Sequence, residues 1–297
     1  MSDYNARLTE DISLINNAIA QIIRKEYSAC LANKVVEAEE YSLNAGGKRI
    51  RSLLCLEFYK LFGGERDVSK LAACLELVHT FSLIHDDMPE MDNDELRRGK
   101  PTTHIAYGSA TALLAGDGLA ILPYKVISDS ALEGDISFET ATKLTNLLAC
   151  SSGNEGMIAG QMIDIDGETR QLSKDEIVEM YRRKTGALIK CACLFGAVLA
   201  GANDEQMQNT ETYAENIGVV FQLVDDILNI KSTAEELGKP VGTDKYRNKS
   251  TLISHIGEDA VLMMISRSTD KAINVIKSYE DAEFLIQFAE EMAKRKN

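Results

Sequence analysis

Residues 75–100 read LELVHTFSLIHDDMPEMDNDELRRGK, an apolar run that passes directly into a dense acidic stretch. On an ideal helix Asp86 and Asp92 would point to different sides, because six residues turn the chain by about 600°. Pro89 breaks a helix and allows the chain to bring Asp92 back toward Asp86. Converging carboxylates that leave most of the coordination shell open are how proteins hold Mg²⁺ for binding to substrate phosphates. The stretch therefore predicts a buried helix that ends in a magnesium site, with a solvated acidic helix end as the simpler alternative.

A second acidic pair lies in residues 221–229, FQLVDDILN, inside another apolar helix. Ionised groups such as Asp225 and Asp226 are costly there unless they meet a cation or a partner. Asp225 and Asn229 are four residues apart and share a helix face. Two acidic clusters that face one another across a cavity would hold metal ions and a polyanion between them.

Apolar residues recur at helical spacing along the 297-residue chain, beginning with Leu8, Ile12 and Ile15. Only 4 prolines interrupt the pattern, and short glycine-containing breaks, such as that at 201–203, separate the segments. No strand pattern, repeat or linker competes with this organisation. We expect an all-α protein with a single domain over residues 1–297, whose helices pack around a central active-site cavity.

The formal net charge of −14 argues against a nucleic-acid partner, since such proteins need a basic surface to displace counterions. An acidic protein can still bind an anionic substrate where metal ions bridge carboxylates to phosphates. The six cysteines lack the spacing of a zinc site or a disulfide framework and are interpreted as small buried residues. The N-terminus lacks the layout of a secretory signal, and no uninterrupted apolar run reaches about 18 residues. We expect a soluble, cytoplasmic protein without stable membrane anchoring.

Basic residues supply the opposite charge. The sequence GGKRIR at 46–51 opens a helix after two glycines, so backbone amides, Lys48 and Arg51 can converge on a phosphate. Further basic residues of interest are Arg97, Arg98, Lys184, Lys239 and Lys249. Each of them, taken alone, is more typical of a surface charge than of a ligand. A lone histidine on an apolar helix, such as His79, is more typical of a satisfied core group.

In combination these motifs resemble those of the trans-isoprenyl diphosphate synthases, above all the bacterial farnesyl-producing members. The resemblance covers nearly the whole chain and rests on the order and spacing of GGKRIR, HDDMPEMDNDELRRGKPTTH, GQMIDI, KTGAL, FQLVDDIL, LGKPVGTD and NKST. It implies a helical isoprenoid-synthase fold and a homodimer. It also implies the condensation of isopentenyl diphosphate with dimethylallyl or geranyl diphosphate to give farnesyl diphosphate and diphosphate.

The same resemblance assigns residues to each part of the site. Isopentenyl diphosphate would be bound by Gly47, Lys48, Arg51, His79 and Arg98. The allylic diphosphate would be bound by Arg97, Lys184, Thr185, Gln222, Lys239 and Lys249, of which the first four would take part in catalysis. Three Mg²⁺ ions, for which Mn²⁺ can substitute, would be held by Asp86, Asp92 and Asp225, with Asp87 and Asp226 in support.

The implied reaction is dissociative, because metal ions and Lys184 would neutralise the charge that builds on the leaving diphosphate. The allylic cation would then alkylate the isopentenyl double bond in a site that excludes water. One departure from the family pattern is Asn229, where the second motif normally ends in Asp. Asparagine keeps an oxygen acceptor but loses a charge, so we expect weaker metal affinity rather than loss of the reaction.

Product length is expected to depend on the helix that runs back from Asp86. Ser82 lies about 6 Å below Asp86 along the axis and Phe81 about 7.5 Å below it. Ser82 is too small to block a prenyl tail. The ring of Phe81 either closes the inner end of the cavity or belongs to ordinary core packing. An aromatic residue here resembles the farnesyl-producing members and favours farnesyl over geranylgeranyl diphosphate. A non-catalytic synthase subunit and a class I terpene cyclase are the remaining alternatives.

Overall fold

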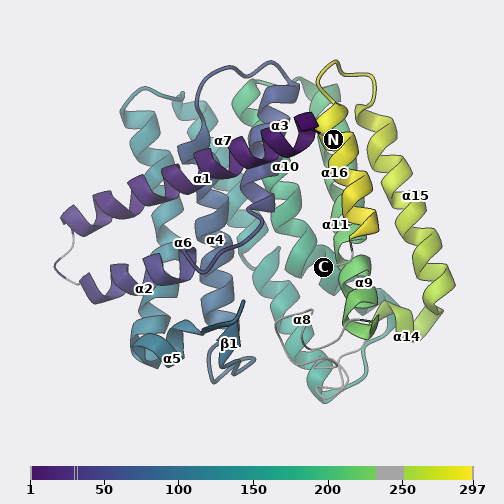
Figure 1. Ribbon diagram of the computed structural model, residues 1–297, viewed down its shortest axis with the longest axis horizontal. Coiled ribbons are helices and arrows are strands. Elements are labelled where there is room, and N and C mark those ends of the chain that lie inside the picture. The colour runs from purple at the N-terminus through teal and green to yellow at the C-terminus, as the bar shows by residue number, and fades with distance from the viewer. Residues whose placement is uncertain (1, 30, 32, 232–250, 296–297) are drawn as a thin grey trace. The chain divides into compact units, whose positions relative to one another are not determined.

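The computed structural model describes residues 2–29, 31, 33–231 and 251–295. Its helices are α1 (Ser2–Ala29), α2 (Asn33–Leu43), α3 (Ile50–Leu61), α4 (Ser69–Asp86), α5 (Thr103–Tyr107), α6 (Ser109–Leu132), α7 (Phe138–Ser152), α8 (Met157–Thr169), α9 (Lys174–Tyr181), the π-helix η1 (Arg182–Gly186), α10 (Ala187–Ala200), α11 (Asp204–Lys231), α14 (Leu252–Ile256), α15 (Glu258–Ile276) and α16 (Glu283–Lys294) (Figure 1). The all-α prediction is confirmed.

A short hairpin is the exception to the helical pattern. Strands β1 (Leu96–Arg97) and β2 (Lys100–Pro101) pair antiparallel, with Leu96 opposite Pro101 and Arg97 opposite Lys100. The sequence analysis predicted no strand here, because two-residue strands carry no alternating pattern. The hairpin matters because it turns Arg97 and Arg98 back toward the helices that precede it in the chain.

Contacts divide the chain into two compact units. The first comprises Met1–Leu56 and Arg66–Thr145, and the second comprises Glu57–Glu65 and Asn146–Asn297. The predicted single domain over 1–297, with its central cavity, stays a prediction.

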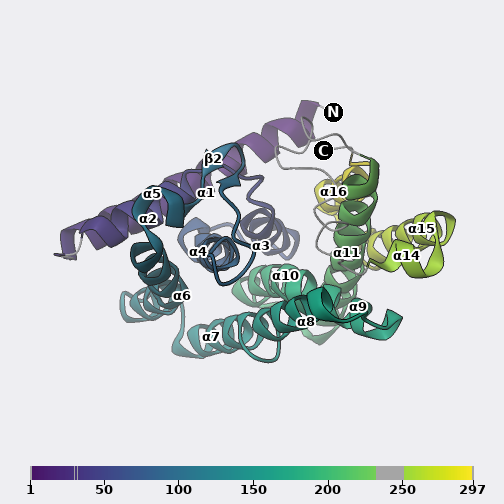
Figure 2. The same ribbon diagram turned by 90° about the horizontal axis from the view of Figure 1, so that it is seen from below.

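In the first unit, α4 is the central helix and packs against α1, α2 and α6 (Figure 2). Most of its side chains are buried, including Leu71, Leu75, Leu77 and Val78. An 18-residue helix that is apolar on nearly every side belongs inside a bundle, because each exposed face would leave apolar surface in water. Both ends of the helix are thereby held firmly, and its C-terminal end carries the first acidic motif.

In the second unit, α11 packs against α10, α15 and α16. The side chains of α10 are buried over most of its length, and the helix ends at Gly201 in the left-handed conformation with φ +74°. Ser173 and Glu176 form a capping box at the start of α9, which fixes the direction in which α9 leads into η1. The unit thus places η1 next to α8 and α11, which carry further predicted site residues.

Helix α6 is long and apolar enough, by length and composition, to cross a membrane, and it is the one such helix within the described residues. Core helices of soluble proteins pass the same test, and 44% of the relevant stretch of α6 is buried. The free cysteines Cys55, Cys74, Cys191 and Cys193 are buried as expected, whereas Cys150 is exposed.

Candidate active site

The first acidic motif begins where α4 ends. The helix stops at Asp86, and the backbone N–H of Asp87 bonds back to the last turn. The chain then reverses, because the N–H of Asp92 donates to the carbonyl of Asp86 at 2.8 Å and Asn93 takes a left-handed φ of +51°. Pro89 fits this turn, since its ring cannot continue a helix. The structure therefore brings Asp86 and Asp92 together with both side chains half-buried, while their role as metal ligands stays a prediction.

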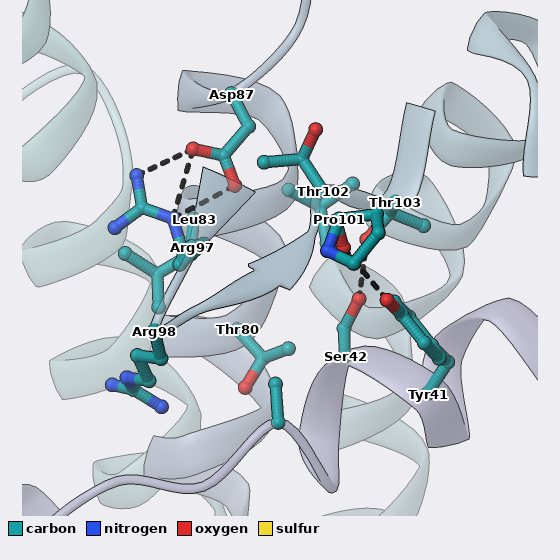
Figure 3. A pocket seen from close by; sticks show the side chains of 12 residues that line it. Tyr41, Ser42, Thr80, Leu83, Asp87, Arg97, Arg98, Pro101, Thr102 and Thr103 are labelled. Carbon is teal, nitrogen blue, oxygen red and sulfur yellow. Dashed lines mark hydrogen bonds and ion pairs between the residues drawn. The ribbon is translucent and has the colours of Figure 1, made fainter. Parts of the chain in front are cut away.

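Asp87 and Arg97 form an ion pair (Figure 3). Nε and Nη2 of Arg97 donate to the carboxylate of Asp87 over 2.5 to 2.8 Å, and Asp87 is only 3% exposed. Two parallel donors on one carboxylate fix the orientation of both side chains and neutralise both charges. The metal-supporting role of Asp87 and the phosphate contact of Arg97 stay predictions.

A small cavity lies beside this ion pair (Figure 3). At its wall the hydroxyl of Tyr41 donates to the carbonyl of Pro101 at 2.7 Å, and the hydroxyls of Ser42 and Thr103 share a hydrogen bond of 2.5 Å. Its volume of about 30 Å³ holds one or two water molecules.

Arg98 and the glycine pair at 46–47 meet closely. Arg98 has a left-handed φ of +54°, and its Nη1 donates to the carbonyl of Gly46. Gly47 has a φ of +142°, which L side chains rarely adopt, and a Cβ there would lie 2.7 Å from Nη1 of Arg98 and displace the guanidinium. Lys48, the next residue, is exposed. The structure brings Gly47 and Arg98 together, with Lys48 adjacent in the chain.

His79 and Arg51 each bury one nitrogen, Nδ1 and Nε respectively, that has no hydrogen-bond partner among the described residues. Burial, together with the charges of Arg51 and Arg98, lowers the pKa of His79 well below its usual value, so the imidazole is neutral at pH 7. Burial also lowers the pKa of Arg51, and the nearby Glu76 acts in the opposite direction. A buried nitrogen without a protein partner is satisfied by water or by a ligand, and an anion would complement the charges of the two arginines.

Arg49 is a residue of this region to which sequence reasoning assigned no role. It is buried, with a left-handed φ of +51°. Its Nε donates to Oδ1 of Asn16 at 2.9 Å, its Nη2 donates to the carbonyl of Leu43 at 2.7 Å, and its Nη1 lies 3.5 Å from the carboxylate of Glu76. Arg49 thereby anchors the loop that carries Gly47. The signal that could have found it is Glu76, a 3% exposed acid in the apolar run of α4, which needs a cation nearby.

In the second unit, Lys184 and Thr185 lie on η1, a π-helical turn between α9 and α10. Such turns are frequent at functional sites. Nζ of Lys184 pairs with Oδ2 of Asp164 on α8 at 2.6 Å, and the hydroxyl of Thr185 donates to Oε1 of Gln222 on α11 at 3.0 Å. Gly160 permits the approach of α8, since a Cβ there would collide with the backbone of Lys184. The sequence analysis assigned no role to Asp164 and did not predict the π-turn, which has no residue pattern of its own.

The two acids of the second motif have different partners. Asp226 is 3% exposed, and one of its oxygens accepts a hydrogen bond from the hydroxyl of Tyr181 at 2.5 Å. Asp225 is more accessible and pairs with the guanidinium of Arg295, which also lies over the ring of Phe221 at 5.0 Å from its centroid. Tyr181 and Arg295 were not predicted, because the contacts join residues 45 and 70 positions apart.

The donor set of the two motifs suits Mg²⁺. Within the described parts of the chain, no group of three His, Cys, Asp or Glu residues could hold a metal by itself. Proteins usually bind Mg²⁺ through one or two carboxylates and leave the other positions to water and substrate phosphates. Asp86 and Asp92, which the turn at Pro89 brings together, could supply such a pair, and Asp225 could supply a single carboxylate. Asn229 belongs to α11, but its side chain is not among those that the structure describes, so its effect on metal affinity stays a prediction.

The chain-length residues lie on α4. Phe81 is half-buried and packs edge-on against the ring of His85, with centroids 5.9 Å apart. Ser82, its neighbour, donates its hydroxyl to a backbone carbonyl of the same helix at 2.8 Å. The predicted allylic ligands Lys239 and Lys249 lie outside the described residues, so their roles stay predictions.

Helices that carry aspartate-rich motifs and a separate cluster of basic residues suit a protein that binds phosphate groups together with metal ions. The chain belongs to the polyprenyl synthetase family, whose model matches residues 32–281. The family joins isopentenyl diphosphate to allylic diphosphates, and membership supports trans-prenyl diphosphate synthase activity.

Relatives and a solved structure agree with this membership. The chain is 43% identical over 212 residues to farnesyl diphosphate synthase of Bacillus subtilis, covering 71% of each chain. It is 39% identical over 266 residues to geranylgeranyl diphosphate synthase of Cyanophora paradoxa, covering 89% of this chain and 88% of the relative. The crystal structure of a geranyltransferase from Legionella pneumophila matches with a TM-score of 0.86 at 28% identity, over 100% of this chain and 99% of that one.

Proposed function

We propose that the chain is a magnesium-dependent farnesyl diphosphate synthase, which condenses isopentenyl diphosphate with dimethylallyl or geranyl diphosphate. The observation that carries this proposal is the basic cluster of Arg51, His79 and Arg98, with two buried nitrogens that lack partners among the described residues. A terpene cyclase, which has one diphosphate substrate, would not need a cluster of this kind in addition to Lys184. A non-catalytic subunit would not need the aspartate pairs.

Different basic residues would bind the isopentenyl substrate and stabilise the leaving diphosphate. Arg51, His79 and Arg98 bind the isopentenyl diphosphate, because charge-assisted hydrogen bonds are the strongest available to a phosphate. Lys184, now paired with Asp164, turns its ammonium to the oxygen of the leaving diphosphate and neutralises the charge that develops there. The allylic carbon–oxygen bond breaks, the isopentenyl double bond bonds to the allylic carbon, and the released diphosphate takes the proton that the condensed cation loses.

The acidic pairs hold the metal part of this site. Bound Mg²⁺ would stabilise the charge on the departing diphosphate as a Lewis acid. Asp86, Asp92 and Asp225 would supply its protein oxygens. Thr185 and Gln222, joined by their hydrogen bond, would present neutral oxygen atoms to the allylic cation, which stabilise it without forming a covalent bond.

Farnesyl diphosphate is the product that Phe81 favours. An aromatic side chain five residues before Asp86 on α4 would stop the growing chain earlier than a small side chain would. Relatives named for farnesyl diphosphate and for geranylgeranyl diphosphate resemble this chain to similar extents. The proposed product length therefore rests on Phe81.

The activity is tested by diphosphate release. The purified protein should release diphosphate at a sustained rate only when isopentenyl diphosphate, an allylic diphosphate and Mg²⁺ are all present. Asp86→Ala and Asp225→Ala should each reduce the rate by orders of magnitude while the protein remains folded. Sustained release from the allylic substrate alone would indicate a cyclase or hydrolase, and no release under any condition would indicate a non-catalytic subunit.

We further propose a soluble, cytoplasmic homodimer in which α6 forms the interface. On α6, Leu113, Leu114 and Ile121 are 45%, 54% and 67% exposed, and Leu114 and Ile121 share a helix face because they are seven residues apart. Exposed apolar side chains that gather on one helix are typical of a protein interface. A second copy of the chain would cover this face, which also accounts for the apolar character of α6 without a membrane.

The oligomeric state is tested by light scattering after gel filtration. Ile121→Glu should convert the dimer to a monomer, because it would place a charge in the apolar contact. Met263→Glu on α15, where the parent side chain is 55% exposed, is the matched control and should leave the dimer intact. A monomeric parent, or a dimer that survives Ile121→Glu, would contradict the proposed interface.

A further inference from the structure

Tyr181 connects the second acidic motif to two other parts of its unit. It is the last residue of α9, directly before η1, and its side chain is 6% exposed. Its hydroxyl donates to Oδ2 of Asp226 at 2.5 Å and accepts the backbone N–H of Leu252, the first residue of α14, at 3.2 Å. A buried tyrosine needs a partner for its hydroxyl, but most such partners are backbone carbonyls or water rather than a functional carboxylate.

The direction of these hydrogen bonds is fixed by their chemistry. A phenol has one hydrogen to donate, and a backbone N–H can only donate. An ionised carboxylate can only accept a hydrogen bond, so the phenol hydrogen is directed to Asp226, while the phenol oxygen also accepts the N–H of Leu252. An O–H···O⁻ bond of this length belongs to the strong, charge-assisted class. Tyr181 therefore serves as a hydrogen-bond donor to Asp226.

The same carboxylate extends the connection to η1. Oδ1 of Asp226 lies 3.5 Å from Nε2 of Gln222, and Oε1 of Gln222 accepts the hydroxyl of Thr185. The first of these contacts is long for a hydrogen bond, whereas the second, at 3.0 Å, is ordinary. Tyr181 thus holds Oδ2 of Asp226 directly, and Oδ1 faces Gln222, the residue that accepts the hydroxyl of Thr185.

We propose that Tyr181 is a positioning residue for the allylic half of the site, an inference that rests on the proposed function. It fixes the carboxylate of Asp226 and, through Gln222, orients Thr185 before substrate and metal arrive. Asp226 is 3% exposed, and an ionised carboxylate at that depth holds one orientation only where fixed donors define it. Groups that orient metal ligands in this way typically change metal affinity or activity by about 10–100-fold when removed.

Tyr213 offers a matched control in the same unit. It is fully buried on α11, and its hydroxyl donates to the backbone carbonyl of Leu285 at 2.8 Å. Tyr213→Phe and Tyr181→Phe each remove one buried phenol hydroxyl without changing the ring. They differ in the acceptor that loses its donor, which is a backbone carbonyl in one case and Asp226 in the other.

The experiment compares the two variants with the parent by two readouts. Mn²⁺ binding is measured by electron paramagnetic resonance in the presence of the unreactive dimethylallyl S-thiolodiphosphate, and KM and kcat are measured with geranyl and isopentenyl diphosphates. Tyr181→Phe should raise the Mn²⁺ dissociation constant and lower kcat by about tenfold or more, with the KM for isopentenyl diphosphate unchanged. Tyr213→Phe should lower the melting temperature and leave metal affinity and kcat at parental values.

A double-mutant cycle with Asp226→Asn tests the route of the effect. If Tyr181 acts through Asp226, Tyr181→Phe should reduce Mn²⁺ affinity much less in the Asp226→Asn background than in the parent. Equal effects in both backgrounds, or parental Mn²⁺ affinity and kcat in Tyr181→Phe, would overturn the inference and leave the proposed function standing. A parent that neither binds Mn²⁺ with the analogue nor condenses the two substrates would refute the proposed function, and the inference with it.

Discussion

The guanidinium of Arg295, one residue beyond α16, pairs with the carboxylate of Asp225 in the second acidic motif. Arg295 is held there by the ring of Phe221, and burial lowers its pKa without removing its charge at neutral pH. An arginine and a divalent cation compete for the same carboxylate oxygens. If Asp225 binds Mg²⁺ as proposed, the ion pair with Arg295 therefore opposes metal binding.

Arg295→Gln should lower the Mg²⁺ concentration that gives half-maximal rate, by about two- to tenfold, because a charged hydrogen bond to a partly exposed carboxylate is worth roughly 0.5–1.5 kcal/mol. The measurement is a Mg²⁺ titration of the initial rate at saturating substrates. Lys294→Gln is the control, since Lys294 pairs only with Glu290 on the exposed side of α16 among the contacts described. An unchanged or higher Mg²⁺ requirement in Arg295→Gln would show that the pair does not oppose metal binding.

The two basic regions should serve different substrates. Lys48→Ala should raise the KM for isopentenyl diphosphate about tenfold or more and leave that for geranyl diphosphate unchanged, because it removes one charge-assisted contact. Lys184→Ala should instead lower kcat, since its charge acts on the leaving group. Steady-state kinetics with each substrate varied in turn separates the two cases. Equal effects of both changes on both substrates would contradict the assignment.

Glu39 should make the stability of the protein depend on pH. It is 5% exposed on α2, and burial, with a smaller contribution from Glu26, raises its pKa from 4.5 to about 7. Between these two values the unfolded chain has lost the proton and the folded chain keeps it, so the contribution of Glu39 to stability falls as pH rises through this window. Glu39→Gln should therefore raise the melting temperature relative to the parent at pH 8 and not at pH 5.

Thermal unfolding of parent and variant at the two pH values checks this expectation. Glu37→Gln on the same helix is the control, because Glu37 is exposed. A difference between Glu39→Gln and the parent that is the same at pH 5 and pH 8 would mean that Glu39 titrates as an ordinary surface acid.

The structure at the end of α4 could be predicted from the sequence. An apolar run followed by acids and Pro89 predicts both the helix and its end, and the backbone bond between Asp92 and Asp86 follows from the same local chemistry. The loop at Gly47 was likewise predictable, since two glycines before a basic helix start indicate close approach of another group. These features are local in the chain, so a few neighbouring residues determine them.

The partners of the charged groups were not predictable in the same way. Arg97 was expected to be a phosphate ligand and pairs with Asp87, while Lys184 pairs with Asp164. Sequence identifies a buried charge that needs a partner, but the choice among many distant partners is made by tertiary packing. The π-turn at Lys184 arises in the same way, because no residue type favours it and close contacts such as that with Gly160 shape it.

Phe81→Ala should lengthen the product. Removing the ring would let the prenyl chain grow past the level of Phe81, so geranylgeranyl diphosphate should become a major product. The ring of His85, which packs against Phe81, would lose a contact, and a modest fall in melting temperature is expected. Ser82→Ala is the control, because it removes little volume. A Phe81→Ala variant that retains full activity and the parental product length would show that other residues limit the length of the product.

Farnesyl diphosphate synthase activity is best tested by measuring the length of the prenyl product that the parent protein makes. The enzyme is supplied with labelled isopentenyl diphosphate in excess, dimethylallyl diphosphate as starter and Mg²⁺, and the dephosphorylated products are separated by reversed-phase chromatography. Farnesol should be the dominant product, with geraniol as a transient intermediate, and geranyl diphosphate as starter should give the same final product. Geranylgeraniol as the main product from either starter would contradict it.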